Sequence, residues 1–161
     1  MVARICAKNP KYAEQHALTA ELARSADRLR DALVEARARD ESAFAQVVEA
    51  SGLPKEAPQR REHLERALFD AAAEPLHGAH LALEVQRLAA RLLEIPNKNL
   101  ISDVGCAAEF GAAAVAACAY NVRINHRFMK DATAIASQAG ELERYETESS
   151  RLLATVRQAA R

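Results

Sequence analysis

Tryptophan is absent from this sequence, cysteine is scarce, and charges of the two signs cancel. The 161 residues contain no Trp, three Cys, and 22 basic against 22 acidic side chains. With aromatic residues at only 4%, the core must be built from Ala, Leu and Val. A formal net charge of zero argues against a general nucleic-acid binder, which usually shows a basic excess or a basic face.

The cysteines and the N-terminus bear on the compartment. Cys6, Cys106 and Cys118 are odd in number and widely spaced, so neither a disulfide framework nor a zinc site of paired cysteines is expected. The N-terminus lacks the apolar core of a signal peptide. The apolar run over 104–120 is short for a membrane span and contains Glu109. We therefore expect a soluble, cytoplasmic protein with no membrane or nucleic-acid partner.

Apolar residues recur at steps of three and four along most of the chain, and no stretch alternates as a strand does. Breaks at Gly and Pro divide this pattern into four expected helices, over about 10–51, 58–94, 99–128 and 131–161. Asn9–Pro10 is the start signal of the first, and Pro75 predicts a kink in the second. Short connections between long helices predict an all-α antiparallel bundle, a single domain over 1–161.

The third expected helix is unusual because Gly and Ala dominate it between residues 105 and 119. A helix that is apolar on all sides is usually buried. Small side chains also let neighbouring backbones approach closely. We therefore expect this Ala/Gly-rich helix in the centre of the bundle or against a second subunit.

Four polar residues crowd the start of that helix: Asn97, Asn99, Ser102 and Asp103. Asn99 or Ser102 could cap the helix, and a cap of this kind contributes about 1 kcal/mol. One capping side chain would suffice, so the surplus also suggests a polar cleft. The residues by themselves leave both interpretations open.

Metal chemistry has a weak signal on the second expected helix. The Glu74-x-x-His77 pair resembles half of the ligand set of carboxylate-bridged di-iron bundles, but no second such pair occurs. His77 and His80 could also hold a metal together with Glu84. A polar helix edge beside Pro75 accounts for these residues more simply.

Thiol chemistry and anion binding have similarly weak signals. Cys106 is near a helix N-terminus, which can lower a thiol pKa, and Cys118 is a second possible nucleophile. Small buried cysteines are, however, common in Ala-rich helices. Two basic groups could bind an anionic tail but are more typical of a solvated helix face: Lys55 with Arg60 and Arg61, and Arg123 with Arg127.

A larger pattern extends over nearly the whole chain. Its most specific part is Ser102-Asp103-Val104, with Asn97 and Asn99 before it and Ala107, Asn121-Val122 and Ile124-Asn125 after it. Its other parts are Lys11-Tyr12, Asp40 with Ala43-Phe44, Pro54-Lys55, and Pro75. In order and approximate spacing these residues resemble the cyclodeaminase/cyclohydrolase family of folate one-carbon metabolism. That family includes the cyclodeaminase half of formiminotransferase-cyclodeaminase and stand-alone bacterial methenyltetrahydrofolate cyclohydrolases.

The resemblance implies an all-helical homodimer with a folate cleft beside the dimer interface. It implies that Asp103 is the catalytic carboxylate, and that further polar residues line or brace the cleft. These are Lys11, Asn97, Asn99, Ser102, Asn121 and Asn125. The expected reaction is the cyclisation of 5-formimino-tetrahydrofolate to 5,10-methenyl-tetrahydrofolate with release of ammonia, or the hydrolysis of the latter. A tetrahydrofolate derivative is the substrate, and no metal or other cofactor is required.

The sequence departs from the family at its N-terminal end. Family members usually carry a Pro- and Gly-rich turn and a small-residue helix before the segment that matches residues 1–12, and this element is expected to be missing here. Lys8-Asn9-Pro10 stands where the family tends to have Gly followed by basic residues. The alternative is therefore a non-catalytic oligomerisation or regulatory domain, a degenerate member that keeps the family's fold.

Overall fold

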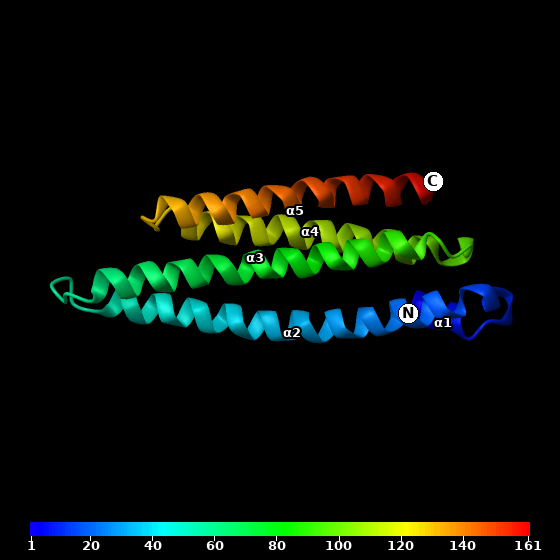
Figure 1. The fold of residues 1–161 in the computed structure, drawn as a ribbon, viewed down its shortest axis with the longest axis horizontal. Coiled ribbons are helices and arrows are strands. Elements are labelled where there is room, and N and C mark those ends of the chain that lie inside the picture. Colours follow the sequence, from blue (N-terminus) through cyan, green and yellow to red (C-terminus); the bar gives the residue numbers. More distant parts are fainter.

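The computed structural model describes residues 1–161, and all its regular structure is helical (Figure 1). The long helices are α2 (His16–Gly52), α3 (Arg60–Leu92), α4 (Ile101–His126) and α5 (Ala132–Ala159). A short helix, α1 (Val2–Ala7), and two 3-10 turns, η1 (Pro10–Gln15) and η2 (Lys98–Leu100), complete the chain. The long helices alternate in direction along the bundle, which confirms the predicted all-α antiparallel fold.

The N-terminal boundary differs from the prediction. Asn9 and Pro10 begin η1, where Oδ1 of Asn9 accepts a hydrogen bond from the backbone N–H of Lys11 at 3.0 Å. Tyr12 then leaves helical geometry, with φ −112° and ψ 30°, and α2 begins only at His16. An Asn-Pro start signal suits a 3-10 turn as well as an α-helix, because both leave their first amides without partners. The six residues of α1 are too few for a periodic pattern and escaped prediction.

The central position in the bundle belongs to α3 rather than to the Ala/Gly-rich α4. Helix α3 contacts α2, α4 and α5, whereas α4 packs against α3 and α5. Twelve of the 33 residues of α3 are buried, against six of the 26 residues of α4. Alanine makes α4 apolar on all sides, but it does not determine which sides are covered within one chain. The other expectation for this helix, a place against a second subunit, stays a prediction.

The open side of α4 is rich in apolar groups. Phe110, Tyr120 and Phe128 are 76%, 75% and 62% exposed, with small alanines between them. The segment Lys98–His126 is long and apolar enough to cross a membrane, and only 22% of its most apolar 18-residue stretch is buried. Large exposed apolar side chains of this kind are typical of surfaces that contact another protein.

A buried glutamine joins three helices. Gln86 of α3 is fully buried, and its Nε2 donates to the carbonyl of Ala108 in α4 at 3.2 Å and to that of Ser149 in α5 at 3.3 Å. Gly111 of α4 lies against it, since a Cβ at this position would be 2.6 Å from Cγ of Gln86. A glycine at position 111 therefore lets α4 approach α3 closely, as the small-residue pattern predicts.

Helix α3 runs through Pro75 without interruption, with help from α4. Proline has no N–H, so the carbonyl of Ala71 loses the helical partner it would have at position 75. Nδ2 of Asn125 donates to that carbonyl at 2.8 Å and to the carbonyl of Asn121 at 2.9 Å. Asn125 thus pairs the acceptor that the proline leaves free, and it ties the end of α4 to α3.

Candidate functional site

A cavity of about 750 Å³ lies between the start of α4 and the N-terminal half of α2, with α3 beneath it. Most of its lining is aliphatic and comes from α1, α2 and α3, while α4 contributes Asp103 and Ala107. Ligand sites commonly have this size and this character, an apolar cleft with a few polar groups. We call it the Asp103 cavity.

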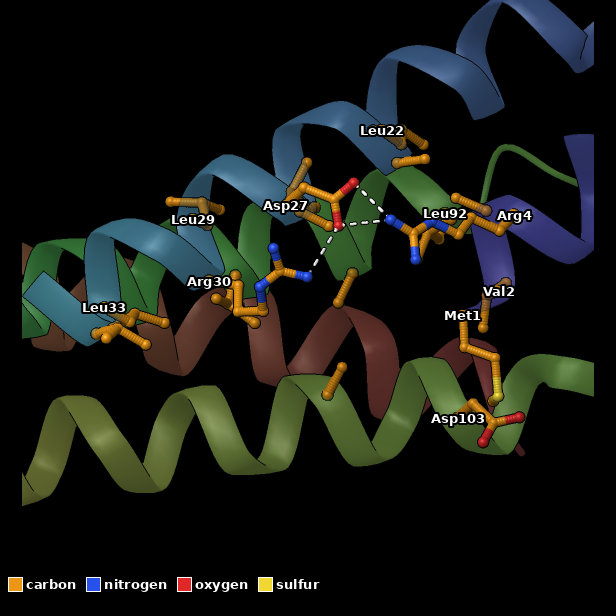
Figure 2. Close-up of a pocket in the computed structure, with 18 of the residues that line it drawn as sticks. Met1, Val2, Arg4, Leu22, Asp27, Leu29, Arg30, Leu33, Leu92 and Asp103 are labelled. Carbon is orange, nitrogen blue, oxygen red and sulfur yellow. Dashed lines mark hydrogen bonds and ion pairs between the residues drawn. The ribbon is translucent and has the colours of Figure 1, made fainter.

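Asp103 belongs to the first turn of α4, where the helix N-terminus favours a negative charge. The predicted capping by Asn99 or Ser102 is wrong: Leu100 is the N-cap, and no side chain makes a cap hydrogen bond there. Asp103 is likewise free of a capping role and lines the cavity, where Figure 2 shows its carboxylate beside Met1. A carboxylate so placed can exchange a proton with a ligand.

An ion-pair network occupies the opposite wall of the Asp103 cavity. A guanidinium nitrogen of Arg4 lies 2.6 and 2.8 Å from the two carboxylate oxygens of Asp27, and Arg30 approaches the same carboxylate at 3.4 Å (Figure 2). Arg30 also binds Asp31 at 2.9 Å, and this hydrogen bond raises the pKa of Arg30. The network joins α1 to α2. No sequence pattern predicts this network, because each member is an ordinary surface residue by itself.

Asn121 and Asn125 line a second cavity, of about 510 Å³, between the C-terminal half of α4 and the far half of α2. We call it the Asp40 cavity after the acidic residue on its α2 side. Asp103 and Asn121 are 18 positions apart, five turns of 3.6 residues, so they project from the same side of α4. Their separation along the helix is about 27 Å. Within one chain, the structure therefore brings Asn121 and Asn125 together and keeps both away from Asp103.

The other polar residues near the start of α4 have separate positions. Oδ1 of Asn97 accepts from the backbone N–H of Asn99 at 3.2 Å and caps η2, while Nδ2 of Asn97 reaches Sγ of Cys6 at 3.3 Å. Asn97 therefore braces this end of the bundle. Asn99 and Ser102 are exposed.

The basic candidates are exposed or engaged in structural contacts. Lys11 is exposed in η1, with Nζ 5.7 Å from the centre of the Tyr12 ring, and lines neither cavity. Arg60 donates to backbone carbonyls at the end of α2, at 3.0 and 3.3 Å, and so closes the α2–α3 connection. Arg123 binds Glu146 of α5 at 2.6 Å.

The geometry does not support the candidate metal ligands or a nucleophilic role of Cys118. Glu74 is bound by Arg39 at 3.0 Å, and no group of three His, Cys, Asp or Glu side chains is placed to hold a metal ion. Burial raises the pKa of the Cys118 thiol, whereas a nucleophilic cysteine needs a lowered pKa.

Comparison with known proteins relates this geometry to one family. The formiminotransferase-cyclodeaminase family model matches residues 1–144. A methenyltetrahydrofolate cyclohydrolase from Methylorubrum extorquens is 32% identical over 147 residues, which cover 89% of this chain and 71% of that protein. The crystal structure of formiminotetrahydrofolate cyclodeaminase from Thermotoga maritima matches with a TM-score of 0.91 and 25% identity, over 99% of this chain and 78% of that one.

Proposed function

Because the chain belongs to the formiminotransferase-cyclodeaminase family, we propose that it is a folate one-carbon enzyme that uses Asp103 for proton transfer. The substrate is 5-formimino- or 5,10-methenyl-tetrahydrofolate. The two relatives carry the names of a cyclohydrolase and a cyclodeaminase, so they support the substrate class and both reactions alike. The observation that carries the proposal is the position of Asp103, a carboxylate outside the helix cap that lines a ligand-sized cavity.

The cyclodeaminase reaction needs one proton to move between two nitrogens. The formimino group is protonated on its nitrogen and forms an amidinium cation with N5. N10 of the folate attacks the carbon of this cation. The Asp103 carboxylate takes the proton of N10 and delivers it to the amino group. The bond from carbon to that amine then breaks, ammonia leaves, and the 5,10-methenyl cation remains. Proton transfer by a positioned side chain contributes about 10²–10⁴-fold to the rate.

The cyclohydrolase reaction places the same carboxylate next to a water molecule. Asp103 removes a proton from the water as its oxygen attacks the methenyl carbon, and then gives this proton to the departing nitrogen. The ring opens as the new hydroxyl group releases its own proton to solvent, which leaves a formyl group. Neither route needs a metal ion. Both suit a soluble cytoplasmic protein.

The exposed side of α4 supports a homodimer as the working unit. Two copies of α4 that pack antiparallel about a two-fold axis would cover Phe110 and Tyr120 and let the alanines between them approach closely. If the helices cross near Ala113 and Ala114, Asp103 of one copy lies beside residues 121–125 of the other. One composite site would then hold the aspartate and the two asparagines that are separate within a single chain.

The composite site predicts that Ala117→Glu produces a monomer. Ala117 is on the exposed side of α4, and the substitution would place two like charges in the apolar contact. Sedimentation velocity should show a dimer for the wild type and a monomer with unchanged helical circular dichroism for the variant. Ala139→Glu, at an exposed position of α5, is the matched control and should remain dimeric. A dimeric Ala117→Glu protein would contradict this interface.

The proposed function is tested by turnover of the two folates. The formation and loss of 5,10-methenyl-tetrahydrofolate are followed by absorbance, starting from 5-formimino-tetrahydrofolate in one assay and from the methenyl compound in the other. Conversion of the first identifies a cyclodeaminase, and hydrolysis of the second a cyclohydrolase. If the folded dimer converts neither compound, the enzyme hypothesis is wrong and the alternative, a non-catalytic oligomerisation or regulatory domain, takes its place.

A further inference from the structure

Asp40 is an acidic residue without a cationic partner in a setting where its neighbours have one. Arg39 binds Glu74 at 3.0 Å, and Arg37 approaches Glu41 at 3.6 Å. Asp40 instead lines the 510 Å³ cavity. Burial, followed by the charges of Glu74 and Glu41, raises the pKa of the Asp40 carboxyl. A carboxylate in such surroundings is suited to a ligand that brings its own hydrogen-bond donors.

The opposite wall of the cavity carries two amides. Asn125 uses both hydrogens of Nδ2 on the backbone carbonyls of Ala71 and Asn121, so its Oδ1 remains as an acceptor. Asn121 adds a complete side-chain amide, with donor and acceptor. The polar part of the cavity therefore consists of the Asp40 carboxylate and the Ser51 hydroxyl on α2, and of two amides on α4.

The remaining lining is apolar and partly aromatic. Phe44 of α2 and Phe128 near the end of α4 are 66% and 62% exposed, and Leu68 of α3 is buried. Aliphatic and aromatic walls on both sides suit a flat ring, and the volume lies within the range of small-molecule sites.

Resting on the proposed folate function, we propose that the Asp40 cavity holds the pteridine ring, with Asp40 as acceptor for the N3–H and 2-amino groups. The 2-amino-4-oxo edge of a pteridine contains a guanidine unit, and it presents two parallel N–H donors in the fork geometry that carboxylates bind from arginine. The oxygen at C4 is an acceptor, for which Nδ2 of Asn121 is the matching donor. Asp40 thus selects the heterocycle, whereas Asp103 acts on the one-carbon unit.

Binding of two ligands to two proteins tests this assignment. The probes are 5-formyl-tetrahydrofolate and its 2-desamino-2-methyl analogue, titrated by calorimetry into full-length wild type and Asp40→Asn. Wild type should bind the analogue at least about tenfold more weakly than the parent compound. Asp40→Asn should bind the parent about ten- to a hundredfold more weakly than wild type does, and should no longer separate the two ligands. Glu49→Gln, an exposed position on the same helix outside the cavity, should behave as wild type.

The outcomes separate this proposal from the function on which it rests. Loss of a carboxylate whose pKa is raised by burial should leave the melting temperature unchanged or slightly higher, so weak binding cannot be ascribed to unfolding. If wild type binds and converts folate while Asp40→Asn binds both ligands as wild type does, the role of Asp40 is overturned and the enzyme stands. If wild type neither binds nor converts a folate, both proposals fall together.

Discussion

Asp103→Asn lowers the turnover of whichever folate the wild type converts by about 10²–10⁴-fold. Asparagine keeps the size and polarity of the side chain but cannot take a proton from N10 and pass it to the leaving amine. The apolar lining of the Asp103 cavity is unchanged, so KM should move much less than kcat. The measurement is the initial rate of absorbance change at saturating substrate. Glu109→Gln removes the same charge from the same helix and should retain activity, since Glu109 pairs with Arg157 on the protein surface. Equal rates for wild type and Asp103→Asn would contradict the proposed role of Asp103 in proton transfer.

Mixing two impaired variants extends this prediction to the composite site. Asn121→Ala is expected to be impaired on its own, because it removes an amide of the Asp40 cavity. When Asp103→Asn and Asn121→Ala dimers are dissociated and reassociated at random, half of the dimers are mixed, and each of these has one intact site of two. About a quarter of the wild-type activity should return. Absence of any recovery, in a mixture shown to contain mixed dimers, would place the whole site within one chain.

Gly111→Leu should destabilise the protein by about 3–5 kcal/mol, among the largest single-residue effects expected in this fold. Even a Cβ at this position would lie 2.6 Å from Cγ of Gln86 and 3.2 Å from the carbonyl oxygen of Ala82. Leucine therefore has to displace Gln86, and the hydrogen bonds from Gln86 to α4 and α5 are lost together. Thermal unfolding followed by circular dichroism should show a melting temperature lower by roughly 10 °C.

Gly140→Leu is the matched control, since a Cβ at this glycine of α5 would meet nothing within 4 Å. Leucine has the higher helix propensity by about 0.5–1 kcal/mol, so this variant should be as stable as wild type or slightly more so. Equal melting temperatures for the two leucine variants would show that close packing of α3 and α4 does not depend on position 111.

The helices were predictable where a local signal coincides with the tertiary contact. The last helix was expected to begin near Asp131, and there Oδ1 of Asp131 accepts from the backbone N–H groups of Thr133 and Ala134 at 2.9 and 3.0 Å. The first long helix begins later than the sequence predicts, because the signal at Asn9–Pro10 belongs to a 3-10 turn that the sequence does not distinguish from a helix. The exposure of α4 was not decided either, since alanine suits a helix–helix contact within a chain and between chains equally well.

For the candidate site, the sequence predicts individual residues but not their grouping. Asp103 lines a cavity, but that cavity is mostly aliphatic rather than the polar cleft that the surplus of polar groups suggests, and Asn97, Asn99 and Ser102 do not line it. In the sequence Asp40 is only one member of a family pattern. It lines the same cavity as Asn121 because α2 and α4 both pack on α3. Residues of different helices share a cavity because of how the helices pack, and the spacing of residues within one helix does not predict this.

Pro75 and Asn125 are coupled through one acceptor, and the cost of losing them depends on which is replaced first. They are 50 positions apart, yet both act on the carbonyl of Ala71. Replacing Pro75 first restores an N–H in α3 and gives that carbonyl its helical partner. Position 125 then no longer needs an amide side chain. Losing Asn125 first leaves a carbonyl with no donor in the middle of a packed helix. Replacement of Asn125 should therefore be tolerated better in a relative that has already lost the proline, because the carbonyl of Ala71 then has its helical partner.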